Sequence, residues 1–287
     1  MADRPVRGPT PAELVSRRAA FRALHETGCF IVPNPWDAGS ARYLRHLGFK
    51  ALATTSAGFA FSRGLPDTGA VPRDLVLGHI AEIVAATDLP VNADFQSGYS
   101  LTPEGVGRNV RLCVEAGAAG VSIEDSTTDA GSPLYDLSEA VERLSAARAA
   151  IDSTGTGVLL VARAECYLVG HPDPLAESIR RLTAYAAAGA DVLFAPGVRS
   201  PKDISALVAA ARPKPLNVLV SSNAGLRVSD LSALGVRRVS VGSALARAAW
   251  TGFIRAARAL ADEGVFTGFD GAVTFDELER LFQSSGT

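Results

Sequence analysis

Few cysteines, no excess of basic residues and no long apolar run limit what this 287-residue sequence can encode. The chain has three cysteines, Cys29, Cys113 and Cys166. Their odd number and wide spacing argue against a disulfide scaffold and a cysteine-rich zinc site. The 28 basic and 30 acidic side chains give a net charge of −2, so nucleic acid is not an expected partner. No apolar run reaches the roughly 18 residues that span a bilayer, and the N-terminal segment lacks the hydrophobic core of a signal peptide. We therefore expect a cytoplasmic protein with no membrane partner.

Two further signals are missing. The histidines form no pair at metal-ligand spacing, which argues against a zinc site: His25, His46, His79 and His171. No GxGxxG motif follows the first apolar run, so a dinucleotide-binding fold lacks its main support. Hydrophobic residues still make up 47% of the chain, enough to bury a large core and to exclude a disordered protein.

A regular alternation of short apolar runs and longer amphipathic stretches fills most of the chain. Each run has the length and composition of a strand buried on both faces. A glycine often ends the stretch before a run, as at the end of a helix. Eight such units favour one α/β domain, residues 1–287, folded as a closed (β/α)₈ barrel; a doubly wound open sheet is the alternative. The runs are 29–34, 51–56, 90–95, 120–125, 157–163, 191–197, 215–220 and 237–243.

Helices are also predicted outside the repeating units. One precedes the first strand, at about residues 11–27, and two follow the last, at 243–264 and 274–283. The final helix has an apolar stripe of Phe275, Leu278, Leu281 and Phe282, so we expect it to dock on another surface. These C-terminal helices exceed what one barrel needs, and we expect residues 243–283 to serve a homo-oligomer.

Two acidic residues stand at the ends of neighbouring apolar runs, where a barrel builds its active site. Burying Asp94 and Glu124 there is costly unless a cation or hydrogen bonds compensate. Such carboxylates suit Mg²⁺, with Mn²⁺ as a substitute, because Mg²⁺ keeps several waters and takes few protein ligands. Alternatively, these acids cap helices or pair with Arg163, and no metal is involved.

Other polar residues also stand near strand ends. Arg163 ends a buried run and offers a planar fork for a carboxylate or phosphate, or else pairs internally with Glu124 or Glu165. The hydroxyls of Thr54, Thr55 and Ser56, with the Ala57 and Gly58 backbone, could bind an anion or simply close the strand end. We include Trp36 and Asn217 among the candidate substrate-binding residues.

Five segments, in their order along the chain, carry a family resemblance: NPWDAGSARYL, TTSAGFAFSRGLPD, NADFQSGY, GVSIED and VARAE. Together they resemble the isocitrate lyase/phosphoenolpyruvate mutase superfamily over about residues 19–258. The resemblance implies a (β/α)₈ barrel that uses Mg²⁺ to bind 2-oxo acids or related carboxylates. It also implies that C–C or P–C bonds are made or broken next to an enolate, and that subunits exchange a C-terminal helix in a tetramer.

The resemblance assigns roles to single residues. It implies metal-side carboxylates at Asp94 and Glu124, an outer acid at Asp67 and a substrate-binding arginine at Arg163. Ser56 with the Ala57 and Gly58 backbone corresponds to the substrate-carboxylate pocket. We take Arg163, Glu165 and Asp67 as the candidate catalytic residues.

Two departures from the family pattern bear on the chemistry. Asn92 replaces the first acid of a D-A-D motif, so metal binding should be weaker or need substrate. The loop at 126–136, STTDAGSPLYD, has none of the Cys, Lys or His residues that lyases carry there. Its small polar residues favour a lid, with an ordinary connection as the alternative. The proton source stays open among Tyr135, Asp129, Ser132, Cys166 and Glu165.

The sequence thus favours a Mg²⁺-dependent lyase or mutase-like enzyme for a small 2-oxo acid or its hydroxy-acid adduct. A phosphonate P–C mutase or hydrolase is one alternative, although few cations stand at the strand ends. A catalytically inactive barrel that binds or regulates is the other, because fold alone does not decide function.

Overall fold

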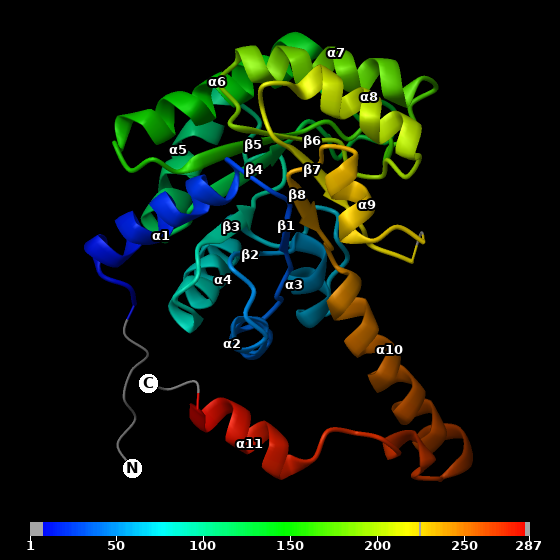
Figure 1. Ribbon diagram of the computed structural model, residues 1–287. Coiled ribbons are helices and arrows are strands. Elements are labelled where there is room, and N and C mark those ends of the chain that lie inside the picture. Colours follow the sequence, from blue (N-terminus) through cyan, green and yellow to red (C-terminus); the bar gives the residue numbers. More distant parts are fainter. Residues whose placement is uncertain (1–7, 224, 285–287) are drawn as a thin grey trace.

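The computed structural model describes residues 8–223 and 225–284, and its centre is a ring of eight parallel strands (Figure 1). Each strand pairs with the next in the chain from β2 to β8, and β8 pairs with β1. The remaining seam, between β2 and the end of β1, is spanned by bonds from Ala53 N–H to Pro33 O at 3.0 Å and from Asn34 Nδ2 to Thr54 O at 2.9 Å. The predicted (β/α)₈ barrel is therefore confirmed. The strands are β1 Phe30–Val32, β2 Leu52–Ala53, β3 Val91–Asp94, β4 Gly120–Glu124, β5 Leu159–Arg163, β6 Val192–Phe194, β7 Leu216–Leu219 and β8 Arg238–Ser240.

Helices surround the strands, and most begin at a side chain that caps the first turn. Thr102 and Asp173 accept backbone N–H bonds at the starts of α5 and α7, each followed by proline, whose missing N–H costs nothing there. The helices before the C-terminal arm are α1 Pro11–Leu24, α2 Ala38–His46, α3 Ser56–Ser62, α4 Arg73–Ala86, α5 Pro103–Glu115, α6 Leu137–Ser153, α7 Pro174–Ala187, α8 Pro201–Ala211 and α9 Val228–Ala233.

All eight predicted strands are present, but each is shorter than its apolar run. The run at 51–56 contributes only Leu52–Ala53, because Thr55 leaves the sheet to cap α3 through a bond from Gly58 N–H. At residue 33 a proline, which has no N–H for the ladder, follows β1. The strand ends therefore turn into loops earlier than apolar patterning indicates, and polar side chains gather at these turns.

Two apolar layers hold the barrel together. The larger lies between the strands and the helices. The smaller fills the barrel interior with residues such as Val32, Val161 and Val192, and Phe21 of α1 packs against it. Arg18 fixes α1 by donating to Ala118 O at 3.0 Å. Apolar side chains thus fill much of the barrel interior, and polar side chains gather toward the C-terminal ends of the strands.

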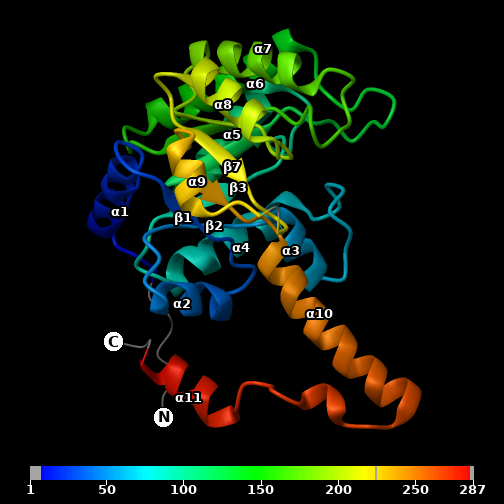
Figure 2. The same cartoon turned by 45° about the vertical axis from the view of Figure 1, so that its right-hand side comes forward.

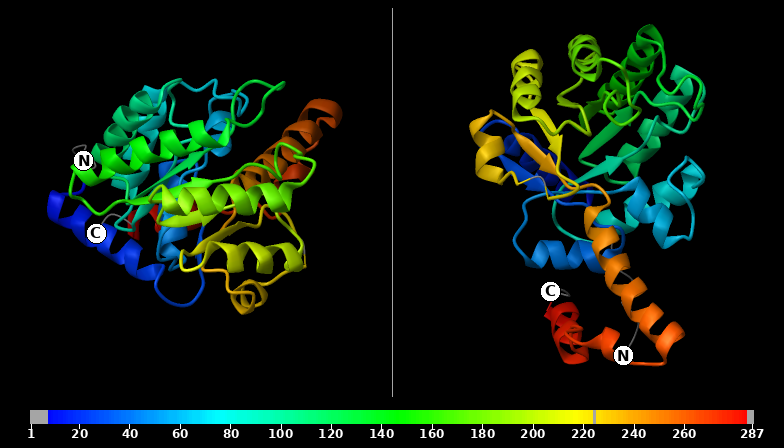
Figure 3. Two further views of the ribbon diagram at one scale, coloured as in Figure 1. Left: turned by 90° about the horizontal axis from the view of Figure 1, so that it is seen from above. Right: turned by 90° about the vertical axis from the view of Figure 1, so that its right-hand side faces the viewer.

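A C-terminal arm leaves the barrel after β8. Helix α10, Ala244–Arg258, projects away from it and continues through a π-helical turn, Ala259–Glu263, and a 3₁₀ turn, Thr267–Phe269, to α11, Phe275–Ser284 (Figures 1 and 2). A side view shows the arm extending beyond the other helices (Figure 3). Several of its aromatic residues are largely exposed: Phe253, Phe266 and Phe275 at 62%, 70% and 77%. None of the helices described is long and apolar enough to cross a membrane.

Candidate active site

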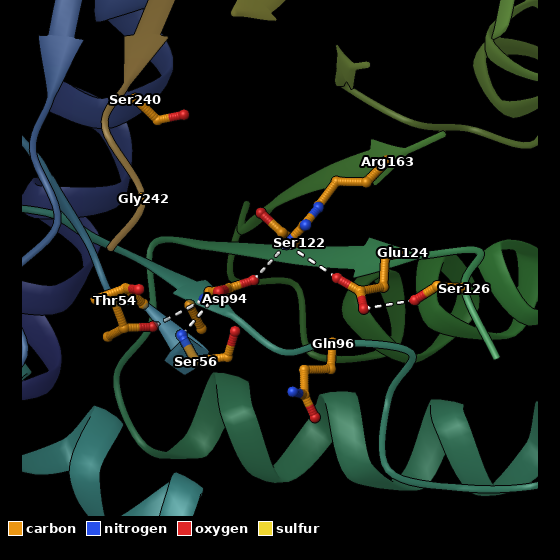
Figure 4. A network of polar contacts seen from close by, with 12 residues as sticks. Thr54, Ser56, Asp94, Gln96, Ser122, Glu124, Ser126, Arg163, Ser240 and Gly242 are labelled. Carbon is orange, nitrogen blue, oxygen red and sulfur yellow. Dashed lines mark hydrogen bonds and ion pairs between the residues drawn. The ribbon is translucent and has the colours of Figure 1, made fainter. Parts of the chain in front are cut away.

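Three adjacent strands each end in a charged residue, and these residues converge on one point. Asp94, Glu124 and Arg163 are the last residues of β3, β4 and β5. Glu124 and Arg163 are direct register partners, and Asp94 pairs with Ser122 two residues before Glu124. Figure 4 shows the three side chains meeting at the carboxyl end of the barrel. This is the end at which barrel enzymes place their chemistry.

The guanidinium of Arg163 contacts three carboxylates. Its Nη1 lies 2.7 Å from Asp94 Oδ1 and 3.0 Å from Glu124 Oε2. Its Nε donates to Glu165 Oε1 at 2.8 Å. Burial lowers the pKa of Arg163, but the surrounding carboxylates outweigh burial and hold the pKa well above its usual value. Arg163 therefore stays charged and balances only part of the negative charge around it.

The carboxylate oxygens of Asp94 and Glu124 that do not contact Arg163 also accept hydrogen bonds. Asp94 Oδ2 accepts the Ser56 N–H at 2.9 Å, while the Asp94 N–H donates to Thr54 Oγ1 at 2.8 Å. Glu124 Oε1 accepts from the Ser126 hydroxyl at 2.7 Å. Burial raises the pKa of Glu124, Arg163 opposes that rise, and the charge of Asp94 adds to it. The strand ends of β2, β3 and β4 are thus linked through Asp94 and its neighbours.

A fourth carboxylate, Asp67, lies at the mouth of the site on an exposed loop. Its Oδ1 accepts from Gln96 Nε2 at 3.1 Å. The loss of surrounding water, and then the charge of Asp94, raise the pKa of Asp67. Asp67 therefore lies close enough to Asp94 for their charges to interact.

Most of the predicted site residues line one cavity of about 190 Å³ that extends from Asp67 into the barrel. Ser56, Ala57, Asp94 and Arg163 line it. Ser240 of β8 and Gly242 in the loop that follows β8 line it across from Arg163 (Figure 4). Glu124 lies in the wall of an adjoining outer cavity of about 610 Å³. The structure therefore brings the predicted metal-side, outer-acid and arginine residues together.

Four predicted residues lie behind the lining of the 190 Å³ cavity. Gly58 already donates its N–H to Thr55 Oγ1 at 3.2 Å, and Trp36 packs beside Gly58. Glu165 is buried and bonds Arg163 from behind. Both polar atoms of Asn217 are used within the barrel, by Ser240 and Arg238. These residues position the lining and do not form it.

Comparison of the whole sequence with models of known protein families supports the resemblance inferred from the five segments. The family model described as phosphoenolpyruvate phosphomutase matches residues 21–261. The chain belongs to this family.

Relatives of the phosphomutase family align over nearly the whole chain. An oxaloacetate decarboxylase of Rhodopseudomonas palustris (strain BisB5) is 30% identical over 94% of this chain and 93% of its own. A candidate lyase/mutase from Burkholderia cenocepacia J2315 has 48% identity and a TM-score of 0.90, covering 94% of this chain and 97% of the other. A structure of oxaloacetate acetylhydrolase with its product oxalate has 29% identity and a TM-score of 0.83, covering 95% and 94%. Relatives of this chain thus include enzymes of the superfamily, lyases and mutases among them.

The loop after β4, which departs from the family pattern, forms a small hairpin over the outer cavity. Ser126 bridges Leu134, and the Thr127 N–H donates to Pro133 O at 2.9 Å. Ser126, Thr127 and Tyr135 line the outer cavity beside Glu124. Two of the candidate proton sources differ in accessibility: Tyr135 lines this outer cavity, whereas Cys166 is fully buried.

A buried network behind the site was not found from the sequence. Asp125 accepts the Glu165 N–H at 2.9 Å, the Tyr185 hydroxyl at 2.5 Å and Arg181 Nη1 at 3.1 Å. Tyr185 and Arg181 come from α7, far along the chain from Asp125. Since Glu165 in turn holds Arg163, this network fixes the guanidinium from below the surface of the site.

The donor set fits a divalent cation held largely through water. Within residues 8–223 and 225–284, no three His, Cys, Asp or Glu side chains form a ready-made metal cluster. Asp94 and Glu124 nevertheless each direct an oxygen at the same Arg163 nitrogen. Asn92, two residues before Asp94 in β3, donates to Ser122 Oγ at 2.9 Å, while its buried Oδ1 has no hydrogen-bond partner among the described residues. Two neighbouring carboxylates, with water completing the coordination shell, are what Mg²⁺ commonly uses.

Proposed function

We propose that this protein is a divalent-cation-dependent lyase that acts on a small 2-oxo acid or its hydroxy-acid adduct through a pyruvate-like enolate. The observation that carries the proposal is the group of three carboxylates, Asp67, Asp94 and Glu124, gathered near the guanidinium of Arg163. The excess negative charge favours a bound cation, and the cavity beside it has room for a small acid.

Asp94 and Glu124 would hold the cation, Mg²⁺ or Mn²⁺. When bound, such a cation polarises a 2-oxo group and stabilises the oxygen of an enolate. The Ser56 N–H and Thr54 hydroxyl fix the Asp94 carboxylate, and Ser126 fixes Glu124. These bonds pre-orient the two acids before any ligand arrives, which lowers the cost of binding.

Arg163 would bind the carboxylate of the substrate. Its planar fork suits a carboxylate, and Glu165 holds Nε so that the rest of the group faces the cavity. Ser56 and Ala57 line the same cavity and offer further polar groups. Because Asp125 in turn accepts the Glu165 N–H, Arg163 is held from the buried side of the site and not by the outer loops.

For a hydroxy-acid adduct, the reaction balances as a retro-aldol cleavage. The hydroxyl proton would pass to a carboxylate of the site, with Asp67 as the candidate, and the hydroxyl oxygen would become the carbonyl of one product. The electrons of the broken C–C bond would form the enolate of the other product. That enolate then takes up a proton. Asp67 is favoured as proton carrier because it lines the cavity and its pKa is raised by partial desolvation and by Asp94.

Relatives support C–C chemistry on 2-oxo acids. The oxaloacetate decarboxylase and the oxaloacetate acetylhydrolase named above both act on a 2-oxo acid by name. P–C chemistry has less support, because the cavity is lined by only two cationic side chains among the described residues, and one of them, Arg163, is shared by three carboxylates.

A turnover panel tests the proposal. Metal-free protein is supplied with Mg²⁺ and a set of 2-oxo and 2-hydroxy acids, and products are followed by proton NMR. We expect at least one acid to be cleaved, and Asp94→Asn to slow that reaction at least 100-fold. Asp88→Asn, which alters a surface pair with Arg45, is the matched control and should leave the rate unchanged. A panel with no turnover would support the inactive-barrel alternative, and full activity in Asp94→Asn would overturn the assignment of the site.

A further inference from the structure

One buried cation of the barrel is not used by the chemistry above. Arg238 is the first residue of β8, is 2% exposed and lines the 190 Å³ cavity. Ser240, two residues on and on the same face of the strand, lines it as well. Arg238 therefore points into the barrel beneath the cluster of Asp94, Glu124 and Arg163.

The guanidinium of Arg238 is only partly satisfied. Its Nε donates to Asn217 Oδ1 at 2.8 Å, and Asn217 Nδ2 donates to Ser240 Oγ at 2.9 Å. Its Nη1 is buried and has no hydrogen-bond partner within the described chain. Asn217 thus orients the Arg238 side chain, while the Nη1 donor of Arg238 is left without a partner among the described residues.

No carboxylate in the described part of the chain forms an ion pair with Arg238, so its charge is uncompensated. His25 is neutral, because burial and then Arg238 lower its pKa to about 3, so His25 neither compensates the charge of Arg238 nor adds to it. Burial lowers the pKa of Arg238 to about 9, which still leaves it charged at neutral pH. A buried, unpaired cation is costly, and an anionic ligand would remove that cost.

The two cations of the cavity differ in this respect. Arg163 is shared by three carboxylates, whereas Arg238 has none. A second buried polar atom of the same cavity, Asn92 Oδ1, also lacks a partner in the described residues. The interior of the barrel is therefore equipped for a polar ligand that reaches below the metal-side residues.

We propose that Arg238 binds a second carboxylate of the ligand, so that the cavity selects small dicarboxylates over monocarboxylates of the same length. This inference rests on the proposed function for the position of the first carboxylate, near Arg163. The cavity, at about 190 Å³, holds several water molecules and so a small acid of this kind. A bound water that bridges Arg238 and its neighbours is the competing explanation of the open donor.

Binding of unreactive acids to metal-free protein tests the proposal separately from turnover. Succinate and butyrate have the same chain length and differ by one carboxylate. We expect calorimetry to give at least tenfold tighter binding of succinate than butyrate to the wild-type protein. Arg238→Met should weaken succinate binding at least tenfold, and Arg238→Lys should retain part of the preference because it keeps the charge.

Arg237→Met is the matched control. Arg237 precedes Arg238, donates from an exposed position to Gly28 O at 2.7 Å, and does not line the cavity. We expect this variant to bind succinate as the wild-type protein does. Equal affinities for succinate and butyrate in the wild-type protein would overturn the proposal, as would undiminished succinate binding in Arg238→Met, the result expected of a bridging water. If Arg238→Met does not fold, the wild-type ratio and Arg238→Lys still decide. Arg238-dependent succinate binding without turnover of any acid would refute the proposed function alone.

Discussion

Replacing Arg163 by methionine should expose how the site balances its charge. The change removes three ion pairs at 2.7, 3.0 and 2.8 Å and keeps the apolar stem. Removing one partner of a buried pair typically costs about 3–5 kcal/mol. Because the side chains of Asp94 and Glu124 keep 16% and 15% of their surface exposed, we expect the lower end, a loss of about 3 kcal/mol in unfolding free energy.

Magnesium should restore most of that loss. In the wild-type protein Arg163 competes with a cation for oxygens of Asp94 and Glu124, and in the variant it does not. Mg²⁺ at 100 times its dissociation constant adds about 2.7 kcal/mol to the stability of the folded state. Urea titrations followed by circular dichroism, in metal-free buffer and with Mg²⁺, measure both effects.

The control for this experiment is Arg148→Met. Arg148 pairs with Asp152 at 2.6 Å and with Asp191 at 2.9 Å, at the opposite end of the barrel. We expect this variant to lose stability that Mg²⁺ does not restore. If Mg²⁺ stabilises Arg163→Met no more than the wild-type protein, the reasoning that Arg163 and a cation share the same oxygens is refuted.

Three further predictions follow from the site and the arm. Burial and the nearby Glu124 outweigh Arg163 and raise the pKa of Glu165 to about 8. The stability that protonated Glu165 contributes is therefore present below pH 4.5 and is lost as the pH rises through 8. Urea titrations of metal-free protein should show this fall in unfolding free energy, and an equal fall in Glu165→Gln would contradict it. We expect light scattering to give a multiple of 29.8 kDa, with a tetramer as the proposed state, and Phe253→Asp to lower that mass; a wild-type mass near 30 kDa would contradict it. Replacing residues 127–132 by a short glycine linker should lower kcat at least tenfold and leave Mg²⁺ binding intact, whereas an unchanged kcat would show that the hairpin is not a lid.

The strand-end rule for barrels explains why part of the site could be predicted from the sequence. Asp94, Glu124 and Arg163 end three consecutive apolar runs, and parallel pairing of neighbours brings such residues to one edge. The same argument placed Ser56 near them. Asp67 lies in a loop that follows α3, so periodicity gave no signal for it, and only the family resemblance pointed to it.

Residues that depend on packing across the barrel could not be predicted. The segment RRVSVGS contains two neighbouring arginines, and the pattern alone does not say that Arg238 faces inward and Arg237 outward. Tyr185 and Asp125 meet only because α7 packs beside the end of β4, which no local motif encodes. The bond from Gly58 N–H to Thr55, by contrast, follows the helix-capping pattern, so the loss of that N–H as an anion donor could have been read from the sequence.

Mutual dependence of Mg²⁺ and oxalate binding tests the proposed cation site most directly, because oxalate mimics the enolate of pyruvate. Calorimetry would measure oxalate binding to the metal-free protein and to the protein with saturating Mg²⁺. We predict at least a tenfold increase in oxalate affinity with Mg²⁺, an equal increase in Mg²⁺ affinity with oxalate, and loss of both in the double variant Asp94→Asn, Glu124→Gln. Oxalate affinity that is the same with and without Mg²⁺, or an increase that survives in the double variant, would contradict a cation held by Asp94 and Glu124.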